Sequence, residues 1–181
     1  ILHQEYSLYA NKTVLENLTD SIGIKHPKEI SKKKSLSVLE ALGFEKEKIL
    51  ELLYKKPDSL SEGERHTIAL AQVLVKEPSI VILDEPAGTK EITKAIKNAR
   101  ELLDETFIIV THDPDFIVDV CDRSCLLLEG NIVEIGSSEY IKQQMISSEI
   151  DKIKKEKTDL SESLKSESVD LDTTERHDSG Y

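Results

Sequence analysis

The chain has 181 residues, of which 38% are hydrophobic and 33% charged, and its formal net charge is −11. This length allows one domain with a real core and some excess, and the acidic balance argues against a sequence-independent nucleic-acid binder, which would need a basic face. The two cysteines favour a structural role over a disulfide framework or a metal site, and no apolar run approaches the roughly 20 residues that a membrane helix needs.

The N-terminal third of the chain is predicted to be a strand end followed by helices. Residues 1–5 pass from an apolar pair into a polar turn that contains Gln4, which by itself reads as a surface loop residue. Thr13 is an expected N-cap, with a glutamate three positions later to complete a capping box. Residues 27–56 carry leucines at helical spacing, interrupted by a cap at Gly43. The lysines in this segment are interpreted as a solvated face.

A polar helix start and an apolar helix follow between Leu60 and Val75. Ser61 can cap the helix through its hydroxyl, and Glu64 can reach back to complete a second capping box. The apolar residues after it predict a helix with a broad buried face. Gly63 lies near the capped end, where exposed backbone N–H groups and the helix dipole favour an anion such as phosphate.

Two adjacent carboxylates come after the next apolar run. Residues 79–83, Ser-Ile-Val-Ile-Leu, suit a strand that is buried on both faces of a parallel sheet. Asp84 and Glu85 follow directly. Because open α/β sheets bind ligands at the carboxyl ends of their strands, these two residues are the first candidates for a functional site.

A second strand with a polar end follows in the sequence. After a loop over residues 87–91, a helix is expected to run to about Leu103, and residues 106–110, Thr-Phe-Ile-Ile-Val, predict another buried strand. His112 comes just after it. A histidine at a strand end is by itself a modest functional candidate. Asp113, Asp115 and Asp119 are interpreted as cap and surface residues of the following helix.

The last part of the chain divides into a hairpin and a tail. Residues 125–128 and 132–135 alternate around Glu-Gly-Asn, which predicts a β-hairpin. From residue 147 onward, Lys, Glu, Ser and Asp dominate and apolar residues are too sparse for a core. Residues 147–181 are therefore expected to form a disordered, acidic and serine-rich tail.

Two of these stretches together resemble the ATP-binding-cassette (ABC) ATPases. Residues 60–65, Leu-Ser-Glu-Gly-Glu-Arg, are similar to the signature motif of that family, and residues 80–86 are similar to its Walker B strand and catalytic glutamate. The resemblance implies an α/β fold, a partial P-loop NTPase domain over residues 1–146. It would have a parallel sheet core and a helical signature subdomain over about residues 13–76.

The resemblance also implies roles for individual residues in ATP hydrolysis. Asp84 would hold Mg²⁺, and Glu85 would polarise the attacking water. His112 matches the histidine that reaches the γ-phosphate, and Gln4 matches the glutamine that touches the metal and the water. Nucleotide-binding roles are expected also for Ser61, Gly63 and Glu64, which would face ATP bound to a second cassette.

The sequence departs from the family pattern at two places. No G-x-x-x-x-G-K-[ST] stretch occurs in the 181 residues, so ATP binding by this chain alone is expected to be weak, and an N-terminal part of the domain is expected to precede it. In the loop after Glu85, Lys90 and Glu91 replace an apolar residue and an aspartate of the family's D-loop. A degenerate, non-hydrolysing regulatory module is therefore one alternative.

A narrower resemblance concerns the role of the intact protein. The variant signature, the segment around Gln4 and residues 73–86 resemble the soluble ATPases that activate methyl-coenzyme M reductase in methanogenic archaea. That implies a cytoplasmic protein with two cassettes and the reductase as a partner. The other alternative is the ATP-binding subunit of a peptide or metal importer, which would pair with a membrane permease.

Overall fold

The computed structural model describes residues 8–23, 27–86, 88–103 and 105–148. The chain divides into two compact units, Ile1–Asp122 and Arg123–Tyr181. The predicted strand end and turn around Gln4, and almost all of the predicted tail, lie outside the described residues. No helix within the described ranges is long and apolar enough to cross a membrane.

Helices make up the N-terminal half of the first unit. They are α1 (Val14–Ile22), α2 (Lys28–Ala41), α3 (Lys46–Leu52), the 3₁₀ turn η1 (Pro57–Ser59) and α4 (Glu62–Leu74). Both predicted capping boxes are present, at the starts of α1 and α4. Gly43 ends α2 with φ 93°, a backbone conformation that suits glycine, so the predicted break between two helices is confirmed.

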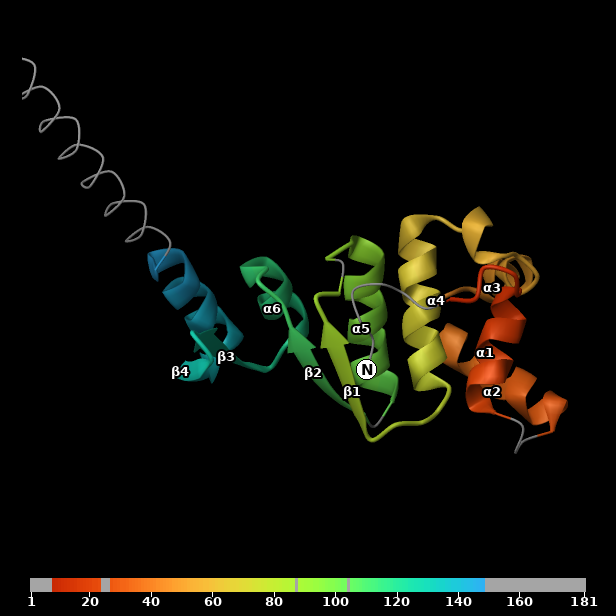
Figure 1. The fold of residues 1–181 in the computed structure, drawn as a ribbon, viewed down its shortest axis with the longest axis horizontal. Helices are drawn as coiled ribbons and strands as arrows, with labels where there is room; N and C mark the ends of the chain where they lie inside the picture. The colour runs from red at the N-terminus through yellow and green to blue at the C-terminus, as the bar shows by residue number, and fades with distance from the viewer. Residues whose placement is uncertain (1–7, 24–26, 87, 104, 149–181) are drawn as a thin grey trace, which may run out of the picture. The chain divides into compact units, whose positions relative to one another are not determined.

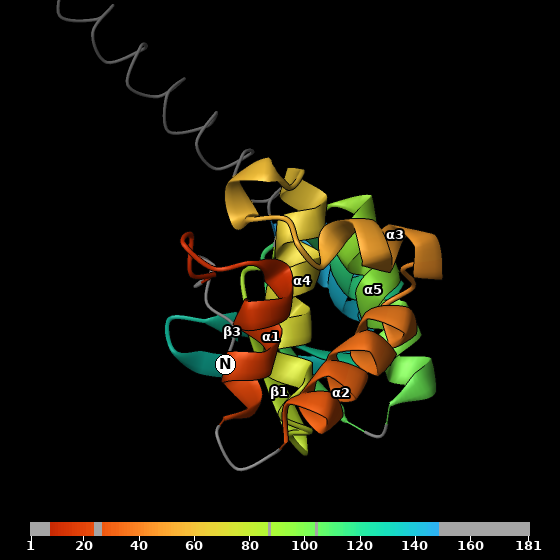
Figure 2. The same cartoon turned by 90° about the vertical axis from the view of Figure 1, so that its right-hand side faces the viewer.

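The helical part supplies much of an apolar core that continues into the strand and the helix that follow α4. Helix α4 packs against α1 and α2, which lie beside it in Figure 2. The side chains that fill this part of the core are fully or almost fully buried: Val14, Leu18, Leu39, Ile49, Leu52, Ile68, Leu70 and Leu74. The buried residues of α4 therefore fix this helix against α1 and α2.

A βαβ element follows α4 (Figure 1). Strand β1 (Ile80–Asp84) leads into α5 (Lys90–Leu102), and α5 leads into β2 (Thr106–Val110). The two strands pair in parallel, with Asp84 opposite Val110, so both polar strand ends lie at the same edge. Helix α5 also packs against α4 and against α6 (Pro114–Val120).

The expectation that both strands are buried on two faces is wrong for the described residues. Val81 and Leu83 are fully buried, but Ile80 is 56% exposed. In β2, Ile108 and Val110 are about half exposed. Burial alternates along the strands because helices cover one face of the pair and no described element of this unit covers the other.

The second unit begins with the predicted hairpin. Strands β3 (Arg123–Leu128) and β4 (Asn131–Ser137) pair antiparallel. The turn between them has Glu129 at φ 49° and Gly130 at φ 78°, two left-handed residues that match the right-handed twist of a two-residue hairpin. Residues 138–148 are helical. The hairpin prediction is confirmed.

Candidate active site

The candidate site lies at the carboxyl edge of β1 and β2. Asp84 is the last residue of β1, and Glu85 continues the pairing because its N–H donates to the carbonyl of Val110 at 2.9 Å. His112 follows β2 by two positions. Parallel pairing therefore brings the two predicted carboxylates and the predicted histidine to one edge, as expected from the sequence.

Glu85 and His112 are in direct contact. The distance from His112 Nδ1 to Glu85 Oε2 is 2.9 Å. The imidazole is 89% exposed, whereas the Glu85 side chain is 31% exposed. The hydrogen bond to Glu85 and its negative charge raise the pKa of His112 above its ordinary value. The pair thus combines a fixed carboxylate with an imidazole that is open to solvent.

The backbone of Glu85 has an unusual conformation. Its φ angle is 47°, in the left-handed region that costs a residue with a side chain about 1–2 kcal/mol. The bond from its N–H to Val110 holds it in place. This conformation turns the chain sharply at the strand end, where the Glu85 carboxylate meets His112, and Pro86 directly after it is buried.

Asp84 lies beside this pair without a partner among the residues that the structure describes. It is exposed at the end of β1. A carboxylate oxygen open to solvent fits the preference of Mg²⁺ for hard oxygen ligands and for keeping part of its water shell. Within the described ranges, no cluster of three or more His, Cys, Asp or Glu could hold a metal by itself. Asp84 alone would thus supply one ligand, and bound phosphate and water would supply the others.

The aspartates after His112 have structural roles, as predicted. Asp113 caps α6 by accepting from the N–H groups of Asp115 and Phe116 at 2.9 and 3.1 Å. Asp119 forms an ion pair with Lys97 of α5 at 2.9 Å. Both carboxylates are used to fix α6.

The first turn of α4 holds the predicted signature residues. The Ser61 hydroxyl accepts from Glu64 N–H at 3.2 Å, and the Glu64 carboxylate accepts from Ser61 N–H at 2.8 Å. Gly63 is buried. A Cβ added to it would lie 2.9 Å from Glu91 Cγ, so any residue larger than glycine requires the Glu91 side chain to shift. The structure therefore brings the signature turn against the start of α5.

The sequence did not indicate that a lysine from another helix contacts this turn. Lys48 of α3 lies with its Nζ 2.7 Å from Glu64 Oε1. Burial acts to raise the pKa of Glu64, but the hydrogen bonds from Lys48 and from Ser61 N–H outweigh it and the pKa is lowered. No spacing rule links a lysine in α3 to a glutamate 16 positions later, so the contact between Lys48 and Glu64 could not be predicted from the sequence.

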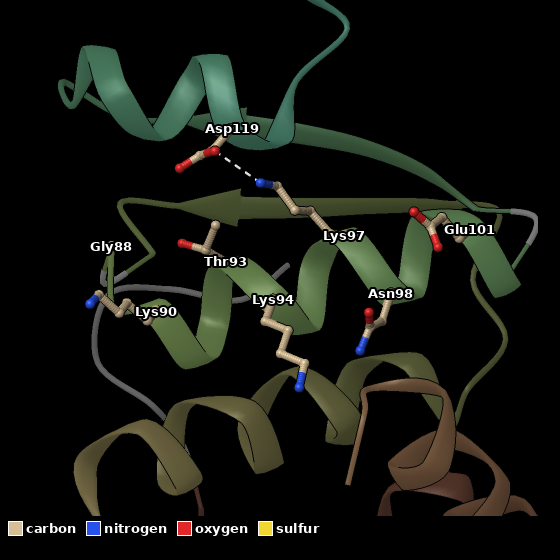
Figure 3. Close-up of a pocket in the computed structure, with 8 residues that line it drawn as sticks. All are labelled: Gly88, Lys90, Thr93, Lys94, Lys97, Asn98, Glu101 and Asp119. Atoms are coloured by element: carbon tan, nitrogen blue, oxygen red, sulfur yellow. Dashed lines mark hydrogen bonds and ion pairs between the residues drawn. The ribbon is translucent and has the colours of Figure 1, made fainter.

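A shallow groove along α5 is separate from these residues (Figure 3). Thr93 and Lys97 lie on its α6 side, whereas Lys94 and Asn98 point the opposite way. Three lysines and two acidic residues line it, and none of the predicted site residues does. The complete lining is Gly88, Lys90, Thr93, Lys94, Lys97, Asn98, Glu101 and Asp119.

The chain is similar to known ATP-binding proteins. A family profile described as "ABC transporter" matches residues 1–88. An uncharacterized ABC transporter ATP-binding protein of Methanocaldococcus jannaschii is 47% identical over 147 residues, which are 78% of this chain and 27% of that protein. A spermidine/putrescine import ATP-binding protein of Clostridium acetobutylicum is 34% identical over 148 residues, 76% of this chain and 40% of the relative.

Solved structures show the same fold. A dimeric ATP-binding cassette in a post-hydrolysis state, bound to ADP and phosphate, matches with a TM-score of 0.63 at 24% identity, over 76% of this chain and 62% of that one. The chain spans about a quarter to two fifths of the length of the two curated relatives. The predicted α/β cassette fold is confirmed.

Proposed function

Because the chain is part of an ATP-binding cassette of the ABC transporter family, we propose that its strand-end residues hydrolyse ATP as part of a longer or paired assembly. The observation that carries this proposal is the 2.9 Å contact between Glu85 and His112 at the common edge of β1 and β2. A carboxylate held there can accept a proton from an attacking water, and an exposed imidazole beside it can contact a phosphate.

The other residues have complementary roles in this proposal. Asp84 would hold Mg²⁺, which neutralises the developing charge on the phosphates. Ser61 and Gly63 would contact a nucleotide held by a second cassette, because the start of α4 offers N–H groups and a positive dipole end. Gln4 would approach the metal and the water. Glu64 would act on the nucleotide only through the turn, since both of its oxygens already have partners.

Substitution of Glu85 by glutamine in the full-length gene product tests the proposal. Glutamine keeps the shape and can still accept a hydrogen bond from His112, but it cannot take a proton. We expect ATP turnover to fall at least about a hundredfold, the range typical of a lost general base, with nucleotide binding retained. Asp115→Asn is the matched control, because Asp115 is an exposed carboxylate near the same edge. Unaltered turnover in Glu85→Gln would exclude the proposed role.

For the biological role, we propose ATP-dependent activation of methyl-coenzyme M reductase by a two-cassette ATPase of the type called component A-two. The length of the archaeal relative supports a two-cassette protein, since 147 residues at 27% of its length correspond to about 540 residues. The same calculation gives about 370 residues for the polyamine importer subunit. Addition of the purified gene product and ATP to inactive reductase should restore methane formation, and no restoration would reject this role.

The importer alternative is supported by the likeness to ATP-binding proteins of polyamine uptake. In that case the gene product would bind a membrane permease and neighbouring genes would encode it. Affinity purification from membranes with a tagged gene product distinguishes the two roles. A co-purified integral membrane protein favours import, whereas a co-purified soluble nickel enzyme favours reductase activation. Turnover of ATP in either case excludes the degenerate, non-hydrolysing module.

A further inference from the structure

The carboxylate of Glu64 joins two helices. Its Oε2 atom accepts from the N–H of Ser61, the N-cap of α4, at 2.8 Å. Its Oε1 atom lies 2.7 Å from Nζ of Lys48 in α3. The Glu64 side chain is only 18% exposed, whereas the Lys48 side chain is 39% exposed. One carboxylate therefore ties a solvent-facing lysine of α3 to the cap of the signature turn.

Lys48 is itself held in place. Its Nζ lies 3.5 Å from Glu51 one turn later in α3, and Glu51 also pairs with Lys55 at 2.5 Å. Four alternating charges thus run from Lys55 to Glu64. Of the two carboxylates near Lys48, Glu64 is the closer, at 2.7 Å against 3.5 Å for Glu51.

The signature turn carries more negative than positive charge. Glu62 and Glu64 occupy the first turn of α4, and Glu91 lies against Gly63. Neither Glu62 nor Glu91 forms an ion pair with any residue in the described part of the chain. The cation on α4 itself is Arg65, whose buried Nε has no hydrogen-bond partner among the described residues. A phosphate that approached this turn would be repelled unless at least one carboxylate were neutralised.

We infer that Lys48 is a positioning residue of the signature turn: it neutralises Glu64 and fixes its carboxylate on the cap, so that Ser61 and Gly63 can receive the phosphates of a nucleotide held by a second cassette. This inference rests on the proposed function. Lys48 acts through Glu64 and does not touch the nucleotide. A glutamate at this position is compatible with an anion site because α3 supplies the opposite charge.

A double-mutant cycle in the full-length gene product tests the inference. The single variants are Lys48→Ala and Glu64→Gln, and the third protein combines them. Glutamine keeps an oxygen that accepts from Ser61 N–H, so the capping box survives while the charge is removed. We expect Lys48→Ala to lower kcat/KM for MgATP about tenfold when Glu64 is present, and less than about twofold in the Glu64→Gln background.

Salt dependence gives a readout that a purely structural role would not change. The ratio of wild-type to Lys48→Ala activity should decrease as NaCl is raised from 0.05 to 1 M, because the Debye length falls to about 3 Å at 1 M. Lys46→Ala is the matched control. Lys46 is exposed in the same helix, so its removal should leave kcat/KM within about twofold of wild type. Thermal unfolding of each variant reports whether the fold is retained.

The outcomes separate this inference from the proposed function. Equal losses in both backgrounds, a ratio that does not change with salt, or a Lys48→Ala loss no larger than that of Lys46→Ala would overturn the role of Lys48 while ATP hydrolysis stands. A wild-type gene product without ATP turnover would instead reject the proposed function, and the inference with it. The inference is supported if Lys48→Ala lowers kcat/KM only in proteins that retain Glu64 and if this loss becomes smaller as salt is raised.

Discussion

His112 Nδ1 and Glu85 Oε2 lie 2.9 Å apart, although the two residues are separated by 27 positions in the chain. Parallel pairing of β1 and β2 is what brings them together, since Glu85 N–H bonds to the last carbonyl of β2. The contact has consequences for the protonation of His112 that can be measured without any nucleotide.

The pKa of His112 should lie above the ordinary value of about 6.5, because Glu85 stabilises the imidazolium. The stabilising effect of this pair is thus fully present below the unfolded pKa and is lost as pH rises through the higher folded pKa. NMR titration of the imidazole in the 181-residue chain measures it. Glu85→Gln should lower this pKa, and Asp115→Asn should change it less. A titration midpoint that does not move in Glu85→Gln would contradict the contact.

Asn17 gives a second prediction, on stability. It is fully buried in α1, and its amide accepts from Tyr9 N–H at 2.7 Å and donates to the carbonyls of Tyr9 and Thr13. Asn17→Leu leaves the Tyr9 N–H without its acceptor and removes one donor each from the carbonyls of Tyr9 and Thr13, which keep their bonds from the backbone N–H groups of Lys12 and Asn17. It should cost about 1–3 kcal/mol of unfolding free energy. Urea unfolding measures the loss.

Hydrogen exchange separates the two halves of the Asn17 amide. In Asn17→Leu, the Tyr9 amide loses its acceptor and should exchange faster. Asn17→Asp keeps an acceptor oxygen for Tyr9 N–H but loses the donors, so it should be destabilised while Tyr9 remains protected. Thr19→Ala is a control within the same helix, because Thr19 is only partly buried. Equal Tyr9 exchange in the Asn17 variants would contradict the assignment.

Interactions between residues close together in the sequence could be predicted, whereas most of those between distant residues could not. The capping boxes of Thr13 and Ser61 and the turn at Gly130 were predictable because they depend on residues a few positions apart. Glu85 and His112 were each predicted as site residues at strand ends, but their 2.9 Å contact was not predicted and results from the parallel pairing of β1 and β2. The pairing of Lys48 with Glu64 depends on how α3 packs beside α4, and no local pattern encodes it.

The sequence did not correctly predict which residues of the strands are buried. Apolar residues at positions 80–83 of β1 predict cover on both faces, but Ile80 is 56% exposed while Leu83 is fully buried. Leu83→Ala should therefore cost about 2–5 kcal/mol, whereas Ile80→Ala should cost less than about 1 kcal/mol. Urea unfolding of the 181-residue chain measures both. Similar costs would mean that Ile80 is covered in solution.

The close approach of Gly63 and Glu91 gives the last prediction. A Cβ on Gly63 would lie 2.9, 3.0 and 3.1 Å from Cγ, Cδ and Cβ of Glu91, so Gly63→Ala requires a shift of the Glu91 side chain or of the start of α5. Overpacking of this kind costs about 1–3 kcal/mol. In a Glu91→Ala background the two nearest atoms are gone and only the 3.1 Å contact with Cβ remains, so the same substitution should cost less than about 1 kcal/mol. Comparison of the four proteins by urea unfolding gives the coupling between the two residues. Additive costs would show that Gly63 is required for a reason other than Glu91.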